Sequence, residues 1–154
     1  MTDRDLSYIL RNIDLNDCEN LGNNIYYTRK IVTLRVYDYQ TRRERPFRSE
    51  EEFLVIAENG IKQGIILNCD NRDLHWYVFI PWRNKGVLSK ALRTGIIKRI
   101  WPNIRTVTCC YNWDDDKQAK WKMTEHLAAL AGLGISEDST CWISKNDSLN
   151  NSHW

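Results

Sequence analysis

Apolar positions in the first third of the chain recur first at helical spacing and then at strand spacing. Residues 5–13 place apolar side chains three or four positions apart, which predicts a short amphipathic helix. Residues 14–24 are polar and rich in turn formers. Residues 32–37 alternate apolar with polar side chains, which predicts a half-buried strand. Residues 42–52 are charged and include Pro46, so we expect a loop or a short helical turn there.

The middle of the chain has the pattern of three strands joined by short turns. Residues 53–57 predict a strand, and the Asn59-Gly60 pair after it tolerates the positive φ of tight hairpin turns. Residues 64–67 predict the returning strand, and residues 74–80 predict a third strand after another turn cluster. Strands in this order typically form an antiparallel meander.

The C-terminal half returns to helical spacing. Apolar residues recur every fourth position through residues 87–101, which predicts one amphipathic helix that Pro102 stops. Residues 107–111 predict a buried strand, and residues 117–131 predict a second helix. For this second helix we expect a C-terminal end at Gly132 or Gly134 and inward side chains at Met123, Leu127 and Leu130.

The order of these elements defines the expected fold class. Residues 140–144 predict a last strand, and residues 146–154 predict a frayed tail. Several antiparallel strands are thus followed by alternating helices and strands. We expect one α/β domain over residues 1–154, with a mixed, mostly antiparallel sheet and helices on both faces.

The charge balance is close to neutral. The 154 residues include 22 lysines and arginines and 20 acidic residues, a formal net charge of +2. A dedicated nucleic-acid-binding protein usually has a strong basic excess, so nucleic acid is the weakest partner hypothesis. The densest basic run contains Arg42, Arg43, Arg45 and Arg48. We interpret it as a solvated loop, with a phosphate-binding role as the alternative.

The cysteines and histidines lack the spacing of a disulfide framework or a metal site. The five cysteines, an odd number, contain no C-x-x-C pair, and the three histidines are not spaced as zinc ligands. We interpret the cysteines as small buried hydrophobes in a reducing compartment. The polar N-terminus and the lack of a long apolar stretch predict neither a signal peptide nor a membrane span, so the expected location is the cytoplasm.

The segment around residues 74–92 carries the most informative candidate chemistry. A predicted strand runs into a short polar loop with one glycine, and the loop opens a predicted helix. Such a junction presents unpaired backbone N–H groups, which can bind a pyrophosphate. Arg83 and Lys85 would add positive charge, and Gly86 would let the backbone approach the ligand closely. A plain tight turn is the alternative interpretation.

At this loop the chain resembles the GCN5-related N-acetyltransferase (GNAT) superfamily. The stretch Arg83-Asn84-Lys85-Gly86-Val87-Leu88 is similar to the family's R/Q-x-x-G-x-G/A loop. Upstream, residues 53–67 resemble the family's second strand, hairpin and third strand. Downstream, a strand, an asparagine and a helix ending at a glycine are similar to the family's fifth strand and fourth helix. The match in order covers residues 53–144, and residues 1–52 would form the family's variable N-terminal part.

The resemblance implies a GNAT-like fold with acetyl-CoA as co-substrate, held in a wedge between residues 74–80 and the strand at residues 106–111. The pyrophosphate would rest on the loop backbone, and a primary amine of a small molecule or a protein would attack the thioester directly. A backbone N–H of the strand before the loop would stabilise the oxyanion. The cofactor-binding residues implied in this way are Val78, Phe79, Ile80, Arg83, Asn84, Lys85, Gly86, Val87, Leu88 and Asn112.

Two departures from the family pattern concern loop shape and catalysis. The sixth loop residue is Leu88, where the family has glycine or alanine. Ala128 stands in place of the family's tyrosine acid, so His126, Tyr111 or a water would have to supply the proton. His75 lies near the position of the general base in many relatives. It is either the proton acceptor for the amine or a sheet-face histidine held by a hydrogen bond.

Neighbouring features also have two interpretations each. The run Asp114-Asp115-Asp116 would attract a cationic amine or cap the following helix, and capping is favoured. Trp82 and Trp113 would stack on adenine or substrate, or simply pack. The leading hypothesis is an acyl-CoA-dependent N-acetyltransferase, and the alternative is a catalytically inactive binding or assembly protein of the same fold. The sequence leaves the oligomeric state open, with a homodimer as one option.

Overall fold

The computed structural model describes residues 3–69, 73–108 and 116–136. The chain divides into two compact units, which are described separately. The first unit comprises Met1–Cys69 and His75–Ala91, and the second comprises Asp70–Leu74 and Leu92–Trp154.

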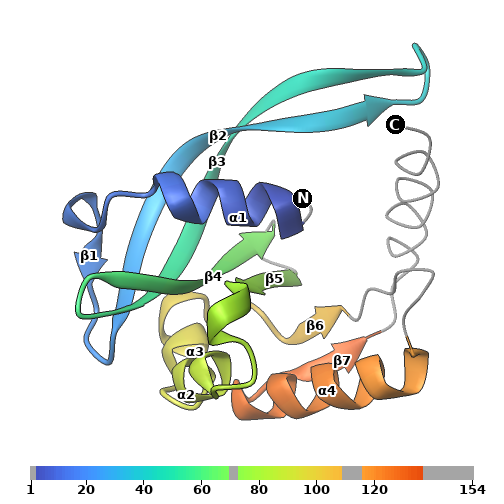
Figure 1. The fold of residues 1–154 in the computed structure, drawn as a ribbon. Helices are drawn as coiled ribbons and strands as arrows, with labels where there is room; N and C mark the ends of the chain where they lie inside the picture. The colour runs from blue at the N-terminus through green and yellow to red at the C-terminus, as the bar shows by residue number, and fades with distance from the viewer. Residues whose placement is uncertain (1–2, 70–72, 109–115, 137–154) are drawn as a thin grey trace. The chain divides into compact units, whose positions relative to one another are not determined.

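A five-stranded meander forms the main sheet (Figure 1). Each strand lies beside the next one in the chain, and the pairs from the first strand to the fourth are antiparallel. The strands are β1 (Glu19–Asn20), β2 (Ile25–Asp38), β3 (Arg43–Glu58), β4 (Ile61–Cys69) and β5 (Asp73–Val78). The predicted antiparallel meander is confirmed.

The turn between β3 and β4 has the backbone that its sequence predicts. Asn59 has a φ of 51° and Gly60 a φ of 77°, both in the left-handed region that favours asparagine and glycine. This turn fixes the register of the hairpin, in which Phe53 lies opposite Leu67.

The prediction of a loop or helical turn at residues 42–52 is wrong, because β3 runs through this segment. β3 pairs with β2 from Arg43 opposite Asp38 to Ile56 opposite Ile25. Among the described residues, β4 pairs with β3 from Glu52 onward, and the first part of β3 pairs with β2 alone. Pro46 lies in this part, where its missing N–H need not cost a ladder hydrogen bond. The sequence pattern does not reveal this part of the strand, because the segment is largely exposed to solvent and its side chains are mostly charged.

Helix α1 (Asp3–Asn12) covers one face of the sheet and confirms the helix predicted at residues 5–13 (Figure 1). Its apolar side packs into a core with alternate residues of the strands. This core comprises Leu6, Leu10, Ile13, Val32, Phe53, Val55, Ile65 and Leu67. The short 3-10 helix η1 (Leu15–Asp17) follows α1 within the segment predicted to be turn-rich.

The prediction of one continuous helix over residues 87–101 is also wrong. The 3-10 turn η2 (Ile80–Trp82) follows β5, and two short helices follow it, α2 (Val87–Leu92) and α3 (Ile96–Ile100). Gly95 separates them with a φ of 74°, and the Thr94 hydroxyl accepts a hydrogen bond from the N–H of Ile96 at 3.3 Å. An apolar stripe with a spacing of four residues fits one helix or two successive helices, so the pattern does not reveal the break.

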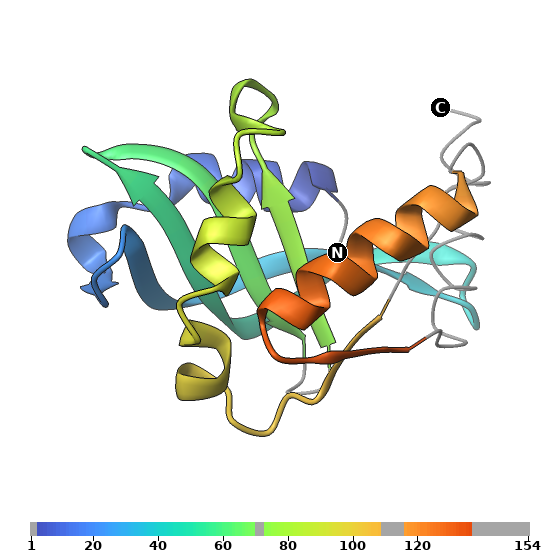
Figure 2. The ribbon, with the colours of Figure 1, turned by 90° about the horizontal axis from the view of Figure 1, so that it is seen from below.

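The second unit contains a parallel pair of strands and the longest helix of the described chain. β6 (Thr106–Thr108) pairs with β7 (Gly134–Ser136), and α4 (Lys117–Leu130) lies beside them (Figure 2). The Asp116 carboxylate accepts a hydrogen bond from the N–H of Ala119 at 3.1 Å, which confirms its predicted capping role. Gly132 follows the helix with a φ of 71°, as expected for its C-terminal end.

The C-terminal region differs from the prediction at Met123 and at β7. Met123 does not point inward, because its side chain is 51% exposed, and Thr124 is buried in its place. The strand β7 was not expected, since residues 134–136 are too short to show a periodic pattern. The strand predicted at residues 140–144 and the tail at residues 146–154 lie outside the described residues. Within the described ranges, no helix has the length and apolarity needed to cross a bilayer.

Candidate functional site

The loop at residues 83–86 joins β5 and η2 to α2 through two left-handed residues. Asn84 has a φ of 59° and Gly86 a φ of 72°. The carbonyl of Gly86 accepts the first helical hydrogen bond, from the N–H of Lys90 at 2.9 Å. A Cβ added to Gly86 would meet no atom within 4 Å, so backbone conformation rather than crowding requires glycine there.

The backbone N–H groups of residues 84–89 lie at the surface of the loop and the first turn of α2. None of them makes a hydrogen bond of good geometry among the described residues, although residues 83–86 form a turn in which some of these groups make weaker internal contacts. The six-residue helix α2 adds little dipole to this site, so any attraction for an anion comes from the N–H groups and from nearby cations.

Leu88 does not obstruct these N–H groups. Its side chain is 9% exposed, and Ala91 on the same helix is 4% exposed. The leucine that departs from the family pattern therefore faces the interior, and the loop surface stays open.

The two cations predicted for the phosphates lie in different surroundings. The Nε of Arg83 donates to the carbonyl of Val78 at 3.0 Å, and its guanidinium lies 5.4 Å from the centre of the Tyr77 ring. The Nζ of Lys85 lies 5.1 Å from the centre of the Trp82 ring. The Arg83 side chain is therefore held by residues of β5, whereas the Lys85 side chain lies next to the loop.

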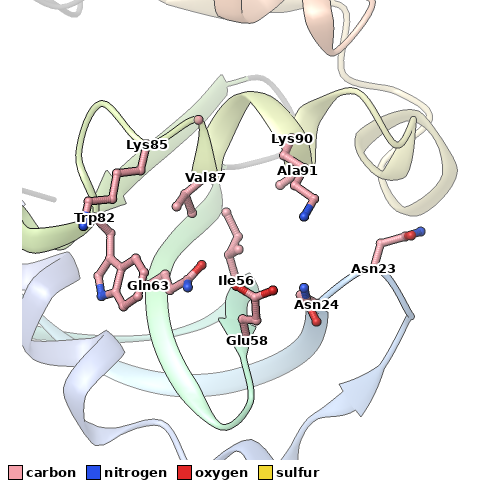
Figure 3. A pocket seen from close by; sticks show the side chains of 11 residues that line it. Asn23, Asn24, Ile56, Glu58, Gln63, Trp82, Lys85, Val87, Lys90 and Ala91 are labelled. Atoms are coloured by element: carbon pink, nitrogen blue, oxygen red, sulfur yellow. The ribbon is translucent and has the colours of Figure 1, made fainter.

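A small pocket adjoins the loop within the first unit (Figure 3). Its volume is about 140 Å³, which fits a single ring or a short chain rather than a whole cofactor. It is lined by Asn23, Asn24, Ile56, Glu58, Gln63, Trp82, Lys85, Gly86, Val87, Lys90 and Ala91.

A larger open groove of about 420 Å³ lies between α1 and β5. Three of its residues are arginines, namely Arg4 and Arg11 on α1 and Arg83 from the loop, and Tyr77 contributes an aromatic ring. The guanidinium of Arg11 also lies 5.8 Å from the centre of the Phe79 ring. Sequence reasoning missed this groove, although the spacing of seven between Arg4 and Arg11 places both on one face of a helix.

The strand residues expected to contact the cofactor are Val78, Phe79 and Ile80, and some of their backbone N–H and carbonyl groups already form hydrogen bonds within the protein. The N–H of Phe79 donates to the carbonyl of Gln63 at 2.9 Å, and the carbonyl of Val78 accepts from Arg83. The N–H of Ile80 has no acceptor among the described residues, and its side chain is 71% exposed. Ile80 therefore offers a backbone N–H that could donate to a ligand.

The structure does not bring the predicted catalytic residues together in one unit. His75 is half-buried on β5, two residues before Tyr77 and thus on the same strand face. His126 lies exposed on α4 in the second unit. Tyr111, together with Asn112 and Trp113, lies outside the described residues.

The resolved shifts in pKa lie away from the loop. Burial raises the pKa of the Glu52 carboxyl, but hydrogen bonds from Tyr27 and Arg29 outweigh burial, and the net pKa is lowered. Burial raises the pKa of the Cys18 thiol, whose Sγ contacts the Asp14 carbonyl at 3.3 Å. A thiol with a raised pKa is a poor nucleophile. Within the described part of the chain, no group of His, Cys, Asp and Glu could hold a metal ion.

Comparisons with other proteins add no family assignment. No protein-family model, curated protein or solved structure matches the chain. The described chain is a mixed α/β protein with a five-stranded meander, and the resemblance of its loop to the acetyltransferase family stays a prediction.

Proposed function

We propose that the protein is an acyl-CoA-dependent N-acetyltransferase that transfers an acetyl group to a primary amine by direct attack. The observation that carries the proposal is the run of N–H groups at residues 84–89, between a strand and a helix, none of which makes an internal hydrogen bond of good geometry among the described residues. Inward packing of Leu88 and the positive φ of Gly86 support it, because both leave this run open to a pyrophosphate.

Different groups of the first unit would bind different parts of acetyl-CoA. The N–H groups of residues 84–89 and the ammonium of Lys85 would hold the phosphates. The free N–H of Ile80 is the candidate donor to the thioester carbonyl, whose oxygen gains negative charge during attack. The wedge expected between β5 and β6 stays a prediction, since the two strands belong mainly to different units.

The groove between α1 and β5 is the candidate site for the acceptor. His75 shares a strand face with Tyr77, which lines the groove, so it would accept a proton from an amine bound there. The arginines Arg4, Arg11 and Arg83 favour an acceptor that carries an anionic group besides its amine.

A catalytically inactive binding protein is the second candidate, and one observation favours it. Ala128, at the position of the family's tyrosine acid, is 1% exposed and carries no proton donor. His126 beside it is exposed on α4. With Tyr111 outside the described residues, a proton donor for the leaving thiolate is not identified.

Binding and turnover experiments test the two candidates separately. We expect mass spectrometry of the purified protein to detect co-purified CoA, and calorimetry to show acetyl-CoA binding. A panel of primary amines, with and without carboxylate or phosphate groups, would then be assayed for release of free CoA thiol. Binding without turnover on any amine would support the inactive candidate, and absence of CoA binding would exclude both.

A further inference from the structure

β4 has one residue more than β3 over their paired length, and this residue is Gln63. Its side chain lies on the face of the sheet toward α2. In the register of β3 with β4, Ile56 lies opposite Gly64 and Ala57 lies opposite Lys62, so Gln63 has no partner on β3. This is a β-bulge, a feature that re-aims side chains near functional sites. The neighbouring Lys62 reaches α1 on the other face, where its Nζ donates to the carbonyl of Ile13 at 2.8 Å.

The bulge places the side-chain amide of Gln63 at the wall of the pocket next to the loop. Gln63 is 5% exposed, and its side-chain amide forms no hydrogen bond with any described residue. Its amide atoms are not among the described side-chain atoms that are both buried and unpartnered, so they reach the open space of the pocket, where a water or a ligand can pair with them. Figure 3 shows the Gln63 side chain among the residues that line the pocket next to the loop.

We propose that this pocket binds the base of an adenine nucleotide. A glutamine amide offers a donor and an acceptor side by side, which matches the amino group and ring nitrogen on one edge of adenine. The indole of Trp82 and the side chains of Ile56 and Val87 provide apolar walls for a flat ring. The volume of about 140 Å³ suits a single base.

Charged residues at the pocket rim suit the rest of the nucleotide. Lys85 and Lys90 both line the pocket and would hold a phosphate. The Glu58 carboxylate would accept hydrogen bonds from ribose hydroxyls, as acidic residues do in other nucleotide sites.

This site goes beyond the proposed acyl transfer, because a nucleotide without pantetheine would bind it. If acetyl-CoA is the co-substrate, its adenine would be the natural occupant. The two proposals can be tested independently. Binding of AMP without acetyl transfer would support the base site and contradict the acetyltransferase. Acetyl transfer with the adenine of CoA bound outside this pocket would support the acetyltransferase and contradict the base site.

Calorimetry with the full chain tests the base site with three probes, AMP, UMP and ribose 5-phosphate. We expect AMP to bind with a Kd below about 1 mM and ribose 5-phosphate to bind at least about tenfold more weakly. Equal binding of AMP and ribose 5-phosphate would mean that only the phosphate is recognised, and it would overturn the proposal. If UMP bound as tightly as AMP, the assignment of the base as adenine would be overturned. If AMP did not bind, the proposal itself would be overturned.

Two matched pairs of variants assign the binding to the pocket. Gln63→Met keeps the length of the side chain and removes the amide, and we expect it to weaken AMP binding by about tenfold. Gln118→Met makes the same change at an exposed position of α4 and should have no effect. Lys90→Gln should also weaken AMP binding, whereas Lys117→Gln should not. Wild-type affinity in Gln63→Met would overturn the proposal.

A measurement on the wild type covers the case in which Gln63→Met does not fold. AMP should shift the NMR signals of the Gln63 side-chain amide and leave those of Gln118 in place. An unshifted Gln63 signal at saturating AMP would show that the base binds elsewhere, and it would overturn the proposal.

Discussion

The hydroxyl of Tyr27 on β2 donates to Oε1 of Glu52 on β3 at 2.6 Å. The same carboxylate accepts from Arg29 at 3.0 Å and from Asn68 on β4 at 3.1 Å. One half-buried anion thus connects three neighbouring strands of the meander. Because its hydrogen bonds favour the charged form, the folded state lowers the pKa of Glu52 below its ordinary value of 4.5.

The first prediction concerns stability against pH. We expect Tyr27→Phe to lower the free energy of unfolding by about 1–2 kcal/mol at neutral pH, because a hydrogen bond to a charged group is lost. Glu52 contributes stability above its unfolded pKa and loses it as pH falls through the lower folded pKa. The difference between variant and wild type should therefore shrink below pH 4.5. Urea unfolding at several pH values measures both quantities.

Tyr8→Phe is the matched control for this experiment. Tyr8 is 70% exposed on α1, so its loss of a hydroxyl should change stability by less than about 0.5 kcal/mol. A Tyr27→Phe effect that is constant down to strongly acidic pH would contradict the role assigned to the Glu52 anion.

The second prediction concerns the C-terminal end of α1. The Nζ of Lys62 donates to the carbonyls of Arg11 at 2.7 Å and Ile13 at 2.8 Å, so it satisfies two groups that the helix leaves unpaired. We expect Lys62→Met to cost about 1–2 kcal/mol of unfolding free energy. Lys122→Met on the exposed side of α4 should cost almost nothing. Hydrogen exchange should become faster in α1 of the Lys62 variant, and unchanged exchange there would contradict the capping role.

The parts of the fold that the sequence predicts well are those in which local signals agree. The hairpin around Asn59 and Gly60 combines apolar strands with a dipeptide suited to its turn, and both appear in the structure. The first part of β3 was missed because its strand character comes from pairing with β2 rather than from a buried face. The break at Gly95 was missed because the apolar stripe continues on both sides of it.

The candidate site was predicted only in part, for the same physical reason. The loop with Gly86 follows from local sequence, and its left-handed backbone agrees with that glycine. Gln63 gave no signal, because a bulge arises from the register of two strands and not from the residue itself. Arg83 was expected to face a phosphate, but the nearest groups it can satisfy are the Val78 carbonyl and the Tyr77 ring.

The third prediction concerns Leu88. Its side chain is buried, so Leu88→Ala should lower the free energy of unfolding by about 2–3 kcal/mol through lost packing. Leu88→Met, which conserves volume, should cost less than about 1.5 kcal/mol. Neither variant should change CoA affinity much under the proposed function, since the backbone and not this side chain faces the phosphates. A large gain in CoA affinity in Leu88→Ala would show that the leucine obstructs the loop.

The fourth prediction concerns His75 as the proton acceptor. His75→Ala should reduce turnover by about a hundredfold near neutral pH, and less at high pH, where the amine substrate is already neutral. Gln118→Ala on the exposed side of α4 serves as control and should not change the rate. Equal losses for His75→Ala at both pH values would remove it as the base and leave it a histidine that supports the sheet.

The fifth prediction separates the loop backbone from general stability. Gly86→Val puts a branched side chain at a φ of 72°, which strains the backbone by at least about 1–2 kcal/mol and should move the N–H groups of residues 84–89. Gly60→Val imposes similar strain at a φ of 77° in the β3–β4 turn, and both sites have open space around the added Cβ. Circular dichroism should show both variants folded, with similar losses in melting temperature. Calorimetry should show CoA binding lost in Gly86→Val alone, and retention of wild-type affinity there would place the pyrophosphate away from this loop.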